Sequence, residues 1–293
     1  MIESHDTTRN TALSTRLLAR SNRITLTSGL APNYLQANLI ILPSRFAFDF
    51  LLLCQRNPVP CPLLASSRIP GSSTALKSHL PGVPDAAIAS SLDLRTDAPL
   101  YMVYHDGELI QSHCPDIVGE WTDDHVAFLI GCSYSFERAL TAAGLSPRHT
   151  VMGRNVPMYE TNMPLCAAGV FTGGTYVVSM RPYRKADVER VRELTRPFVS
   201  THGEPVAWGW DAVERLGIKD INAPEFGDAP LGLDGGFFSA PEQDEEIVPV
   251  FWGCGVTPQL AVMKAELPGR VMGHAPGHML VLDVMEDDIV EKI

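Results

Sequence analysis

The chain has 293 residues, of which 45% are hydrophobic and 19% are charged, a balance that suits one large α/β domain or two smaller ones. Its formal net charge of −11 argues against a nucleic-acid-binding protein, because such proteins need a basic surface. The longest apolar runs, such as 39–42 and 50–54, are too short to cross a bilayer, and the first 25 residues lack the apolar segment of a signal peptide. We therefore expect a cytoplasmic protein with no membrane or nucleic-acid partner.

Six cysteines are spread along the chain without a Cys-x-x-Cys pair, so a reducing compartment is the simpler interpretation. Cysteines and histidines lie too far apart in sequence for a ribbon-type zinc site. No Gly-rich phosphate-binding loop follows a predicted strand, because Gly173-Gly174 and Gly235-Gly236 are isolated pairs. We expect neither a metal nor a cofactor.

The N-terminal third of the chain predicts helices followed by a loop. Residues 13–20 form a short helical pattern, and Pro32 suits the first turn of a helix over 30–39. Residues 44–55, SRFAFDFLLLCQ, predict another helix, which is apolar nearly all round and should be deeply buried. Residues 66–99 are rich in Ser, Pro, Gly and Asp, so we expect a surface loop there.

A β-hairpin and a buried strand are predicted next. Residues 101–105 and 109–111 flank Asp106-Gly107, a pair that accepts the positive φ values of a tight hairpin turn. The continuous apolar run 126–130 is typical of a central strand. It enters a Gly-Cys turn, after which a helix is predicted to continue to about Ala143.

This strand–turn–helix pattern occurs twice. Ala127–Leu140, AFLIGCSYSFERAL, aligns without gaps within Pro249–Met263, PVFWGCGVTPQLAVM, so that each copy places a cysteine where a strand meets a helix. We call residues 131–133 the first corner and residues 253–255 the second corner. Backbone N–H groups at a helix N-terminus favour negative charge and lower the pKa of a thiol. We expect both corners to face one site for a small anionic molecule.

Between the corners the pattern predicts a small α+β block. Residues 154–162 cannot form a regular helix because of Pro157, residues 176–180 predict a strand, and residues 186–198 predict an amphipathic helix. We predict an inserted α+β domain over 150–219. The rest of the chain would form the main α/β domain, which comprises residues 1–149 and 220–293.

The motifs of the chain resemble those of the hydro-lyase family related to D-glutamate cyclase. The resemblance covers about residues 25–285 and rests on GLAPNYLQANL, CQRNPVPCPLL, AFLIGCSYSFE, GRNVPMYETNMPL, VSMRP, HGEPV, VPVFWGCGVTPQ and HAPGHM. It implies a three-layer α/β/α main domain with a smaller two-layer domain, and a reversible loss of water that converts D-glutamate to 5-oxo-D-proline without a cofactor. Asn33 stands where the family usually has Gly, and 207–213, AWGWDAV, replace a HIGDP-like segment.

Cyclising glutamate needs a base for the amine, an acid for the leaving oxygen and donors for the developing oxyanion. The candidate catalytic residues are Cys132, Cys254, His274 and His278. Backbone N–H groups at Ser133 and Gly255 are candidate oxyanion donors. In the alternative interpretation, the cysteines pack beneath tight turns and one of the two histidines is satisfied by backbone hydrogen bonds.

Arg154 and Arg181 are candidates for binding substrate carboxylates, because a guanidinium group suits bidentate pairing. Three further residues are expected to complete the polar lining: Asn155, Tyr159 and Thr161. The alternative for each arginine is an ion pair with Glu160 or Glu204.

Three functions are compatible with these residues. The first is a carbon–oxygen lyase that acts on D-glutamate, 5-oxoproline or a similar small acid. The second is a non-catalytic protein that binds a small carboxylate, and the third is a cysteine-dependent amide hydrolase. In each case the expected partner is a small carboxylate or amino acid, and a homo-oligomer would be common for such enzymes.

Overall fold

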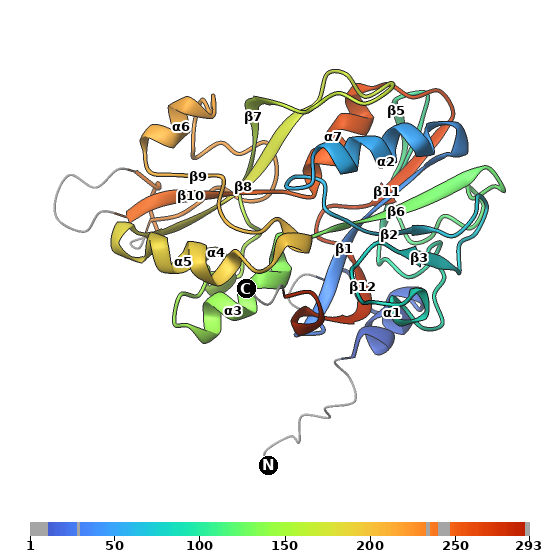
Figure 1. Ribbon diagram of the computed structural model, residues 1–293, viewed down its shortest axis with the longest axis horizontal. Coiled ribbons are helices and arrows are strands. Elements are labelled where there is room, and N and C mark those ends of the chain that lie inside the picture. The colour runs from blue at the N-terminus through green and yellow to red at the C-terminus, as the bar shows by residue number, and fades with distance from the viewer. Residues whose placement is uncertain (1–10, 28–29, 233–234, 240–246, 291–293) are drawn as a thin grey trace, which may run out of the picture. The chain divides into compact units, whose positions relative to one another are not determined.

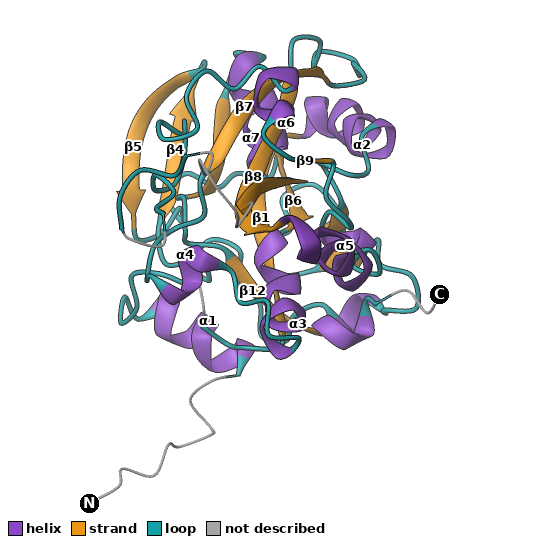
Figure 2. Ribbon diagram, turned by 90° about the vertical axis from the view of Figure 1, so that its left-hand side faces the viewer, coloured by secondary structure: helices purple, strands orange, loops and turns teal. Residues whose placement is uncertain are grey.

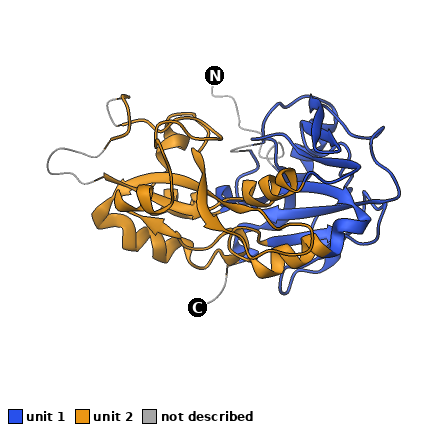
Figure 3. Ribbon diagram, turned by 90° about the horizontal axis from the view of Figure 1, so that it is seen from above, with its two compact units in different colours: residues 1–48, 63–135, 266–289 blue, residues 49–62, 136–265, 290–293 orange. Residues whose placement is uncertain are grey.

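The computed structural model shows a mixed α/β fold with helices and two antiparallel sheets (Figure 1). The residues that it describes are 11–27, 30–232, 235–239 and 247–290. Contacts divide the chain into two compact units, coloured separately in Figure 3. The first unit comprises 1–48, 63–135 and 266–289, and the second comprises 49–62, 136–265 and 290–293. The three-layer arrangement and the inserted domain stay predictions.

The first unit is built on one antiparallel sheet. Its strands are β1 (Tyr34–Pro43), β2 (Leu63–Ser67), β3 (Leu76–Ser78), β4 (Tyr101–His105), β5 (Glu108–Cys114), β6 (His125–Gly131), β11 (Arg270–His274) and β12 (Leu280–Met285). Their order is β3-β2-β6-β1-β11-β4-β5, and β12 also pairs with β1. β1 therefore has β6 on one side and both β11 and β12 on the other, which places it at the centre of the sheet.

The helix predicted over 30–39 is wrong, because residues 34–39 belong to β1. All of β1 except Tyr34 is buried, so its sequence lacks the alternation of polar and apolar residues that marks a half-exposed strand. Before the strand, Ala31 and Asn33 take positive φ values of 49° and 77°. Cross-strand pairing on both sides outweighs the local preference for a helix.

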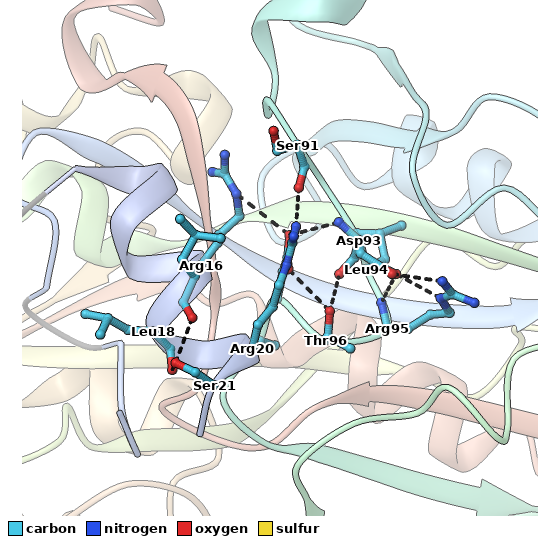
Figure 4. Close-up of polar contacts among 12 residues, drawn as sticks. Arg16, Leu18, Arg20, Ser21, Ser91, Asp93, Leu94, Arg95 and Thr96 are labelled. Atoms are coloured by element: carbon cyan, nitrogen blue, oxygen red, sulfur yellow. Dashed lines mark hydrogen bonds and ion pairs between the residues drawn. The ribbon is translucent and has the colours of Figure 1, made fainter. Parts of the chain in front are cut away.

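The short helix predicted over 13–20 is confirmed as α1 (Ala12–Arg20), and buried ion pairs hold it on the first unit (Figure 4). Arg16 is fully buried, and its guanidinium donates to the carbonyl of Val281 at 2.8 Å and to a carboxylate oxygen of Asp283 at 2.9 Å. Arg20 pairs with the buried carboxylate of Asp97. Burial raises the pKa of Asp97, although the two arginines oppose that shift.

The predicted hairpin is confirmed as β4 and β5, which Figure 2 shows as adjacent strands. Its turn residues Asp106 and Gly107 have φ values of 50° and 84°. The predicted surface loop over 66–99 is only partly correct. This segment contributes β3 to the sheet, and its Ile88 and Leu94 side chains are fully buried in the core.

The second unit contains a four-stranded antiparallel sheet in the order β7-β8-β10-β9. Its strands are β7 (Met158–Pro164), β8 (Thr175–Arg184), β9 (Ala207–Trp208) and β10 (Ile247–Gly253). The other helices are α2 (Ala47–Arg56), α3 (Glu137–Ala142), α4 (Arg148–Val151), α5 (Val188–Thr195), α6 (Asp211–Arg215) and α7 (Val256–Lys264). α7 and α4 pack against β8, and α3 packs against α5.

Several local predictions for this part of the chain are confirmed. The strand at 176–180 lies within β8, the helix at 186–198 contains α5, and a 3₁₀ turn followed by α2 covers the helix predicted at 44–55. Deep burial of that last helix is wrong. Phe50 and Leu53 are fully buried, but Phe48 is 74% exposed, so only one face of α2 is packed.

Candidate functional site

The first corner follows β6, at the point where the chain leaves the first unit's sheet. Cys132 and Ser133 are both buried there. The predicted single helix is instead a 3₁₀ helix over Ser133–Phe136, followed by α3 with only six residues. Its first turn is closed by the N–H of Ser135, which donates to the carbonyl of Cys132 at 3.1 Å. A helix this short contributes little of the dipole that the prediction assumed.

Asn38, in the centre of β1, fixes this corner from the neighbouring strand. Its side-chain amide donates to the carbonyl of Gly131 at 3.1 Å and lies 3.5 Å from the carbonyl of Ile130. The side chain is 5% exposed. Sequence reasoning missed this residue because it placed Asn38 in a helix, where an asparagine gives no such signal.

The sheet brings the first corner and the histidine loop to the same side of the first unit. β6 and β11 pair with opposite sides of β1 and both run antiparallel to it. Gly131, at the end of β6, pairs with Ala37 of β1. At the end of β11, Gly273 pairs with Ile40, and His274 is the next residue. Adjacent strands lie about 4.8 Å apart, so the two strand ends are on the order of 10 Å from each other.

His274 is a buried, neutral imidazole. It is 4% exposed, and its Nδ1 accepts a hydrogen bond from the N–H of Leu39 at 3.2 Å. Nδ1 also lies 3.4 Å from the carbonyl of Leu39, and the shorter contact, with the N–H, favours the tautomer that carries the ring proton on Nε2. Burial lowers the pKa of His274 to about 4, so at neutral pH the ring can donate a hydrogen bond but carries no charge.

His278 lies four residues further along, in the loop before β12. Its Nδ1 lies 2.7 Å from the carbonyl of Pro276, so this nitrogen carries a proton that it donates to that oxygen. The ring packs edge-on against His113 with centroids 5.9 Å apart. Burial lowers the pKa of His278, although nearby backbone carbonyls oppose the shift. Both histidines thus use one ring nitrogen for the backbone, and their catalytic role stays a prediction.

The second corner joins β10 to α7, a helix of nine residues with Gly255 at its N-cap. A Cβ added to Gly253 would lie 3.2 Å from the carbonyl oxygen of Val59 and 3.4 Å from Cα of Pro60, so the backbone itself is closely packed there. The thiol of Cys254 lies 3.3 Å from the sulfur of Met158. This corner is therefore a tightly enclosed turn.

The expected lowering of the thiol pKa is wrong for Cys254. Burial raises the pKa of Cys254 to about 11, and it outweighs the opposing effects of the Val256 N–H and the Arg181 charge. At neutral pH this cysteine is a thiol. The correction follows from the enclosure of the corner, because a helix N-terminus lowers a thiol pKa only where the thiolate also keeps some solvation.

Arg181 lies in β8, is fully buried and pairs with Glu137. Its Nε donates to Oε1 of Glu137 at 2.9 Å, and a second guanidinium nitrogen donates to Ser179 at 3.0 Å. The guanidinium also lies 5.0 Å from the ring centroid of Phe136 and 5.3 Å from that of Trp252. The alternative interpretation named Glu160 or Glu204 as the partner of Arg181. Glu160 instead pairs with Lys264, and Glu204 pairs with Arg192 and Arg196.

Glu137 is the hub of this buried cluster. Besides Arg181, it lies 3.2 Å from Nε2 of His149 and accepts a hydrogen bond from Thr150 at 3.0 Å. Burial alone would raise the pKa of Glu137, but Arg181 and His149 hold it below its ordinary value. The carboxylate is therefore ionised at neutral pH. Sequence reasoning missed Glu137 and His149, because a glutamate after a helix start and a histidine after a proline are usually solvated.

Arg154 and Asn155 line a small cavity of about 20 Å³ in the second unit, and their role in binding a substrate stays a prediction. The other lining residues are Arg148, His149, Met152, Pro157, Met180, Pro182, Ala229, Pro230 and Leu231. The backbone N–H of Asn155 donates to Asp228 at 2.7 Å. Nε of Arg154 is buried and has no hydrogen-bond partner within the part of the chain that the structure describes.

Tyr159 and Thr161 do not line this cavity. The hydroxyl of Tyr159 donates to the carbonyl of Ile221, and its ring packs edge-on against Phe251 in the core of the second unit. The hydroxyl of Thr161 donates to the carbonyl of Tyr176 at 2.9 Å. Both hydroxyls thus donate hydrogen bonds to backbone carbonyls of the second unit.

The segment 207–213, which departs from the family pattern, forms β9 and the start of α6. It borders a cavity of about 670 Å³ whose lining includes Trp208, Trp210, Lys185 and Arg215. Arg192 stacks on Trp208 at 4.4 Å from its ring centroid. Trp208 and Trp210 therefore give this cavity of the second unit an aromatic lining.

Two negative findings apply to the described ranges. No group of three or more His, Cys, Asp or Glu side chains in them has the geometry to hold a metal ion. Among the helices that the structure describes there, none combines the length and the apolar character that crossing a membrane requires.

Comparison with known proteins places the chain in a family. The sequence model of D-glutamate cyclase matches residues 126–283, more than half of the chain. Three relatives share the printed name Putative hydro-lyase. That of Schizosaccharomyces pombe is 46% identical over 92% of this chain and 81% of its own, and that of Rubrobacter xylanophilus is 47% identical over 88% and 89%. That of Bordetella petrii is 46% identical over 96% of this chain and 97% of its own. The chain therefore belongs to the D-glutamate cyclase family, a relationship that supports a lyase-type function.

Proposed function

We propose that this protein is a carbon–oxygen lyase that interconverts D-glutamate and 5-oxo-D-proline with loss or addition of water. The observation that carries the proposal is the arrangement of the first unit, in which the ends of β6 and β11 flank β1. This arrangement puts Cys132 and Ser133 on the order of 10 Å from His274, a distance that a five-carbon acid can span. The family relationship supports the reaction class.

The reaction balances without a cofactor. The α-nitrogen forms a bond to the γ-carboxyl carbon, one carbon–oxygen bond breaks, and the two protons lost by the ammonium group leave with that oxygen as water. The groups required are a base, a proton or hydrogen-bond donor, and dipoles for the oxyanion.

The first unit offers a residue for each of these roles. The Nε2–H of His274 is the proposed donor to the carboxyl oxygen, because its Nδ1 is already used by Leu39. His278, neutral because its pKa is lowered by burial, is the proposed base. The first corner, fixed by Asn38, is the proposed site of the oxyanion. A cysteine-dependent hydrolase is disfavoured at the second corner, because Cys254 is protonated at neutral pH.

The test is a direct assay with chiral chromatography. Purified protein is incubated with D-glutamate, L-glutamate and both enantiomers of 5-oxoproline, and each amino acid is quantified over time. We expect conversion between the two D forms. A protein that binds one of these acids but converts none would be a carboxylate-binding protein, and the proposed reaction would be wrong.

Two variants connect the activity to the first unit. His274→Gln should lower kcat by about 100-fold or more, the contribution typical of a positioned proton donor. The matched control is His105→Gln, because His105 has a half-exposed side chain at the end of β4. Equal activity of the two variants would remove His274 from the proposed mechanism.

A further inference from the structure

We propose that the side-chain oxygen of Gln36 binds the nitrogen of the substrate through an N–H···O hydrogen bond, so that the site in the first unit selects acids that carry an N–H group. The proposal rests on the proposed function, because it takes the ends of β6 and β11 as the place where the substrate binds. It adds the group that holds the nitrogen while protons are transferred.

Gln36 lies near the start of β1, and the residue is only 5% exposed. Its amide nitrogen donates to the carbonyl of Thr27 at 2.9 Å and to the carbonyl of Leu30 at 3.3 Å. These two acceptors fix the orientation of the carboxamide, because exchanging its nitrogen and oxygen would direct an oxygen at two carbonyl oxygens. The side-chain oxygen, Oε1, therefore points away from both carbonyls.

Oε1 of Gln36 is buried and has no hydrogen-bond partner among the residues that the structure describes. Buried acceptors in folded proteins are nearly always paired, because leaving one without a donor costs free energy. An amide oxygen only accepts hydrogen bonds, so its partner must carry an N–H or O–H group. A substrate carboxylate would be repelled at this oxygen, whereas the amino or lactam nitrogen of the proposed substrates would donate to it.

The strand register places Gln36 at the level of the first corner. The next residue, Ala37, pairs with Gly131 at the end of β6 and with Leu280 of β12 on its other side. β6 runs antiparallel to β1, so the chain beyond Gly131 passes the level of Gln36 as it leaves the sheet. Gln36 therefore lies beside the corner that we propose as the site of the oxyanion.

Thr27 connects Gln36 to the histidine loop. While its carbonyl accepts the hydrogen bond from Gln36, its own N–H donates to the carbonyl of Gly277 at 3.2 Å. Its hydroxyl donates to the carbonyl of Met279 at 2.8 Å. Gly277 and Met279 are the two neighbours of His278, the proposed base. The carboxamide of Gln36 is therefore one residue removed from the backbone on both sides of that base.

This contact fits the hydrogen count of the reaction. The ammonium group of D-glutamate carries three N–H bonds, of which two are lost with the departing water and one remains in the lactam. The N–H that donates to Gln36 is the one that remains, so the contact is kept in the amino acid and in 5-oxo-D-proline. Gln36 gains and loses no proton, and it supplies affinity and orientation. An acid without an N–H group at this position loses the contact.

The first test compares two ligands on the wild-type protein by calorimetry. One is 5-oxo-D-proline, and the other is 3-oxocyclopentanecarboxylate of the matching configuration, in which a CH₂ group replaces the N–H. We expect the lactam to bind at least about tenfold more tightly, because the ketone leaves Oε1 of Gln36 without a donor. Equal affinities, or no binding of the lactam, would overturn the proposal.

The second test removes the acceptor. Gln36→Met roughly keeps the volume of the side chain, and the preference for the lactam over the ketone should fall to within about threefold. Gln111→Met is the matched control, because Gln111 lies in β5 of the same sheet and its amide donates to Glu120 at 2.7 Å. This control should keep the wild-type preference. A Gln36→Met protein that keeps it too would overturn the proposal, and the ligand pair on the wild type decides the matter if Gln36→Met does not fold.

Turnover measured beside binding separates this proposal from the proposed function. A preference for the lactam that depends on Gln36, in a protein that converts neither D-glutamate nor 5-oxo-D-proline, would refute the lyase and support the recognition of the nitrogen. Turnover in a wild type whose preference survives in Gln36→Met would refute the role of Gln36 and leave the lyase intact.

Discussion

The two Gly-Cys corners have the same sequence pattern but different surroundings. The first corner is held by the side chain of Asn38 and enters a 3₁₀ helix, whereas the second packs its backbone against Val59 and Pro60 and enters a nine-residue α-helix. The second corner also buries a thiol that stays protonated. The repeated motif thus gives a buried strand and a turn in both places, while the neighbouring elements decide which helix follows and how the thiol is surrounded. The following predictions test this contrast.

The largest effect is expected around the second corner, at Arg181. Replacing Arg181 by Leu leaves the carboxylate of Glu137 buried without its main partner, which should cost about 3–5 kcal/mol in the free energy of unfolding. Adding Glu137→Gln to Arg181→Leu should restore much of that loss. Urea unfolding of the wild type, the single variant and the double variant measures both effects. A single variant within about 1 kcal/mol of the wild type would show that the pair is not essential to the fold.

Near the first corner, the next largest effect is a dependence of stability on pH that comes from His274. The folded-state pKa of His274 is about 4, below the ordinary value near 6.5. Only the unfolded chain binds this proton between these values, so stability is fully present above pH 6.5 and falls as the pH drops towards 4. The loss should reach roughly 3 kcal/mol at most. His274→Gln should show a smaller change between pH 7 and pH 4.5 in chemical unfolding, and an unchanged slope would contradict the assignment.

A smaller effect is expected at Asn38, which distinguishes the first corner from the second. Asn38→Ala removes the hydrogen bond to the carbonyl of Gly131 and should cost about 1–3 kcal/mol, because a buried acceptor loses its partner. Asn162→Ala is the comparison, since Asn162 has an exposed side chain in β7. Thermal unfolding at one protein concentration measures the difference. Similar melting temperatures for the two variants would mean that Asn38 does not support the corner.

The last prediction concerns the reactivity of two cysteine thiols and involves no change in stability. With a pKa of about 11, only about one Cys254 in a thousand is a thiolate at pH 8. Iodoacetamide should therefore modify the exposed Cys166 and leave Cys254 intact in the folded protein. Mass spectrometry of the digested protein after brief alkylation counts each adduct. Modification of Cys254 as fast as Cys166 would show that the second corner opens or holds a reactive thiolate.

The sequence predicts local structure where a short pattern determines it. The Asp106-Gly107 turn, the strand before the first corner and the amphipathic helix at α5 are examples, since each depends on neighbouring residues alone. β1 was predicted as a helix because a strand buried on both faces has no alternating pattern. The pairing of β10 with β9 could not be predicted either, because β9 has only two residues.

The candidate site also contains residues that the sequence predicts and residues that it does not. Arg154 and Asn155 were predicted from a polar segment interrupted by prolines, and both line a cavity. Glu137, His149 and Asn38 were missed, since their roles depend on partners between 12 and 93 residues away in the chain. Whether both corners face one ligand stays a prediction, because Cys132 and Cys254 belong to different units.

The anchoring of α1 has a consequence for biosynthesis. Arg16 donates to the carbonyl of Val281, a partner 265 positions later in the chain. Ribosomes release α1 long before β12 has been made, so the guanidinium of Arg16 stays hydrated until its acceptors have been synthesised. The nascent first sheet stays open until β11 and β12 have been made. Shortened gene products that stop ahead of β12 should therefore accumulate as protease-sensitive or insoluble material.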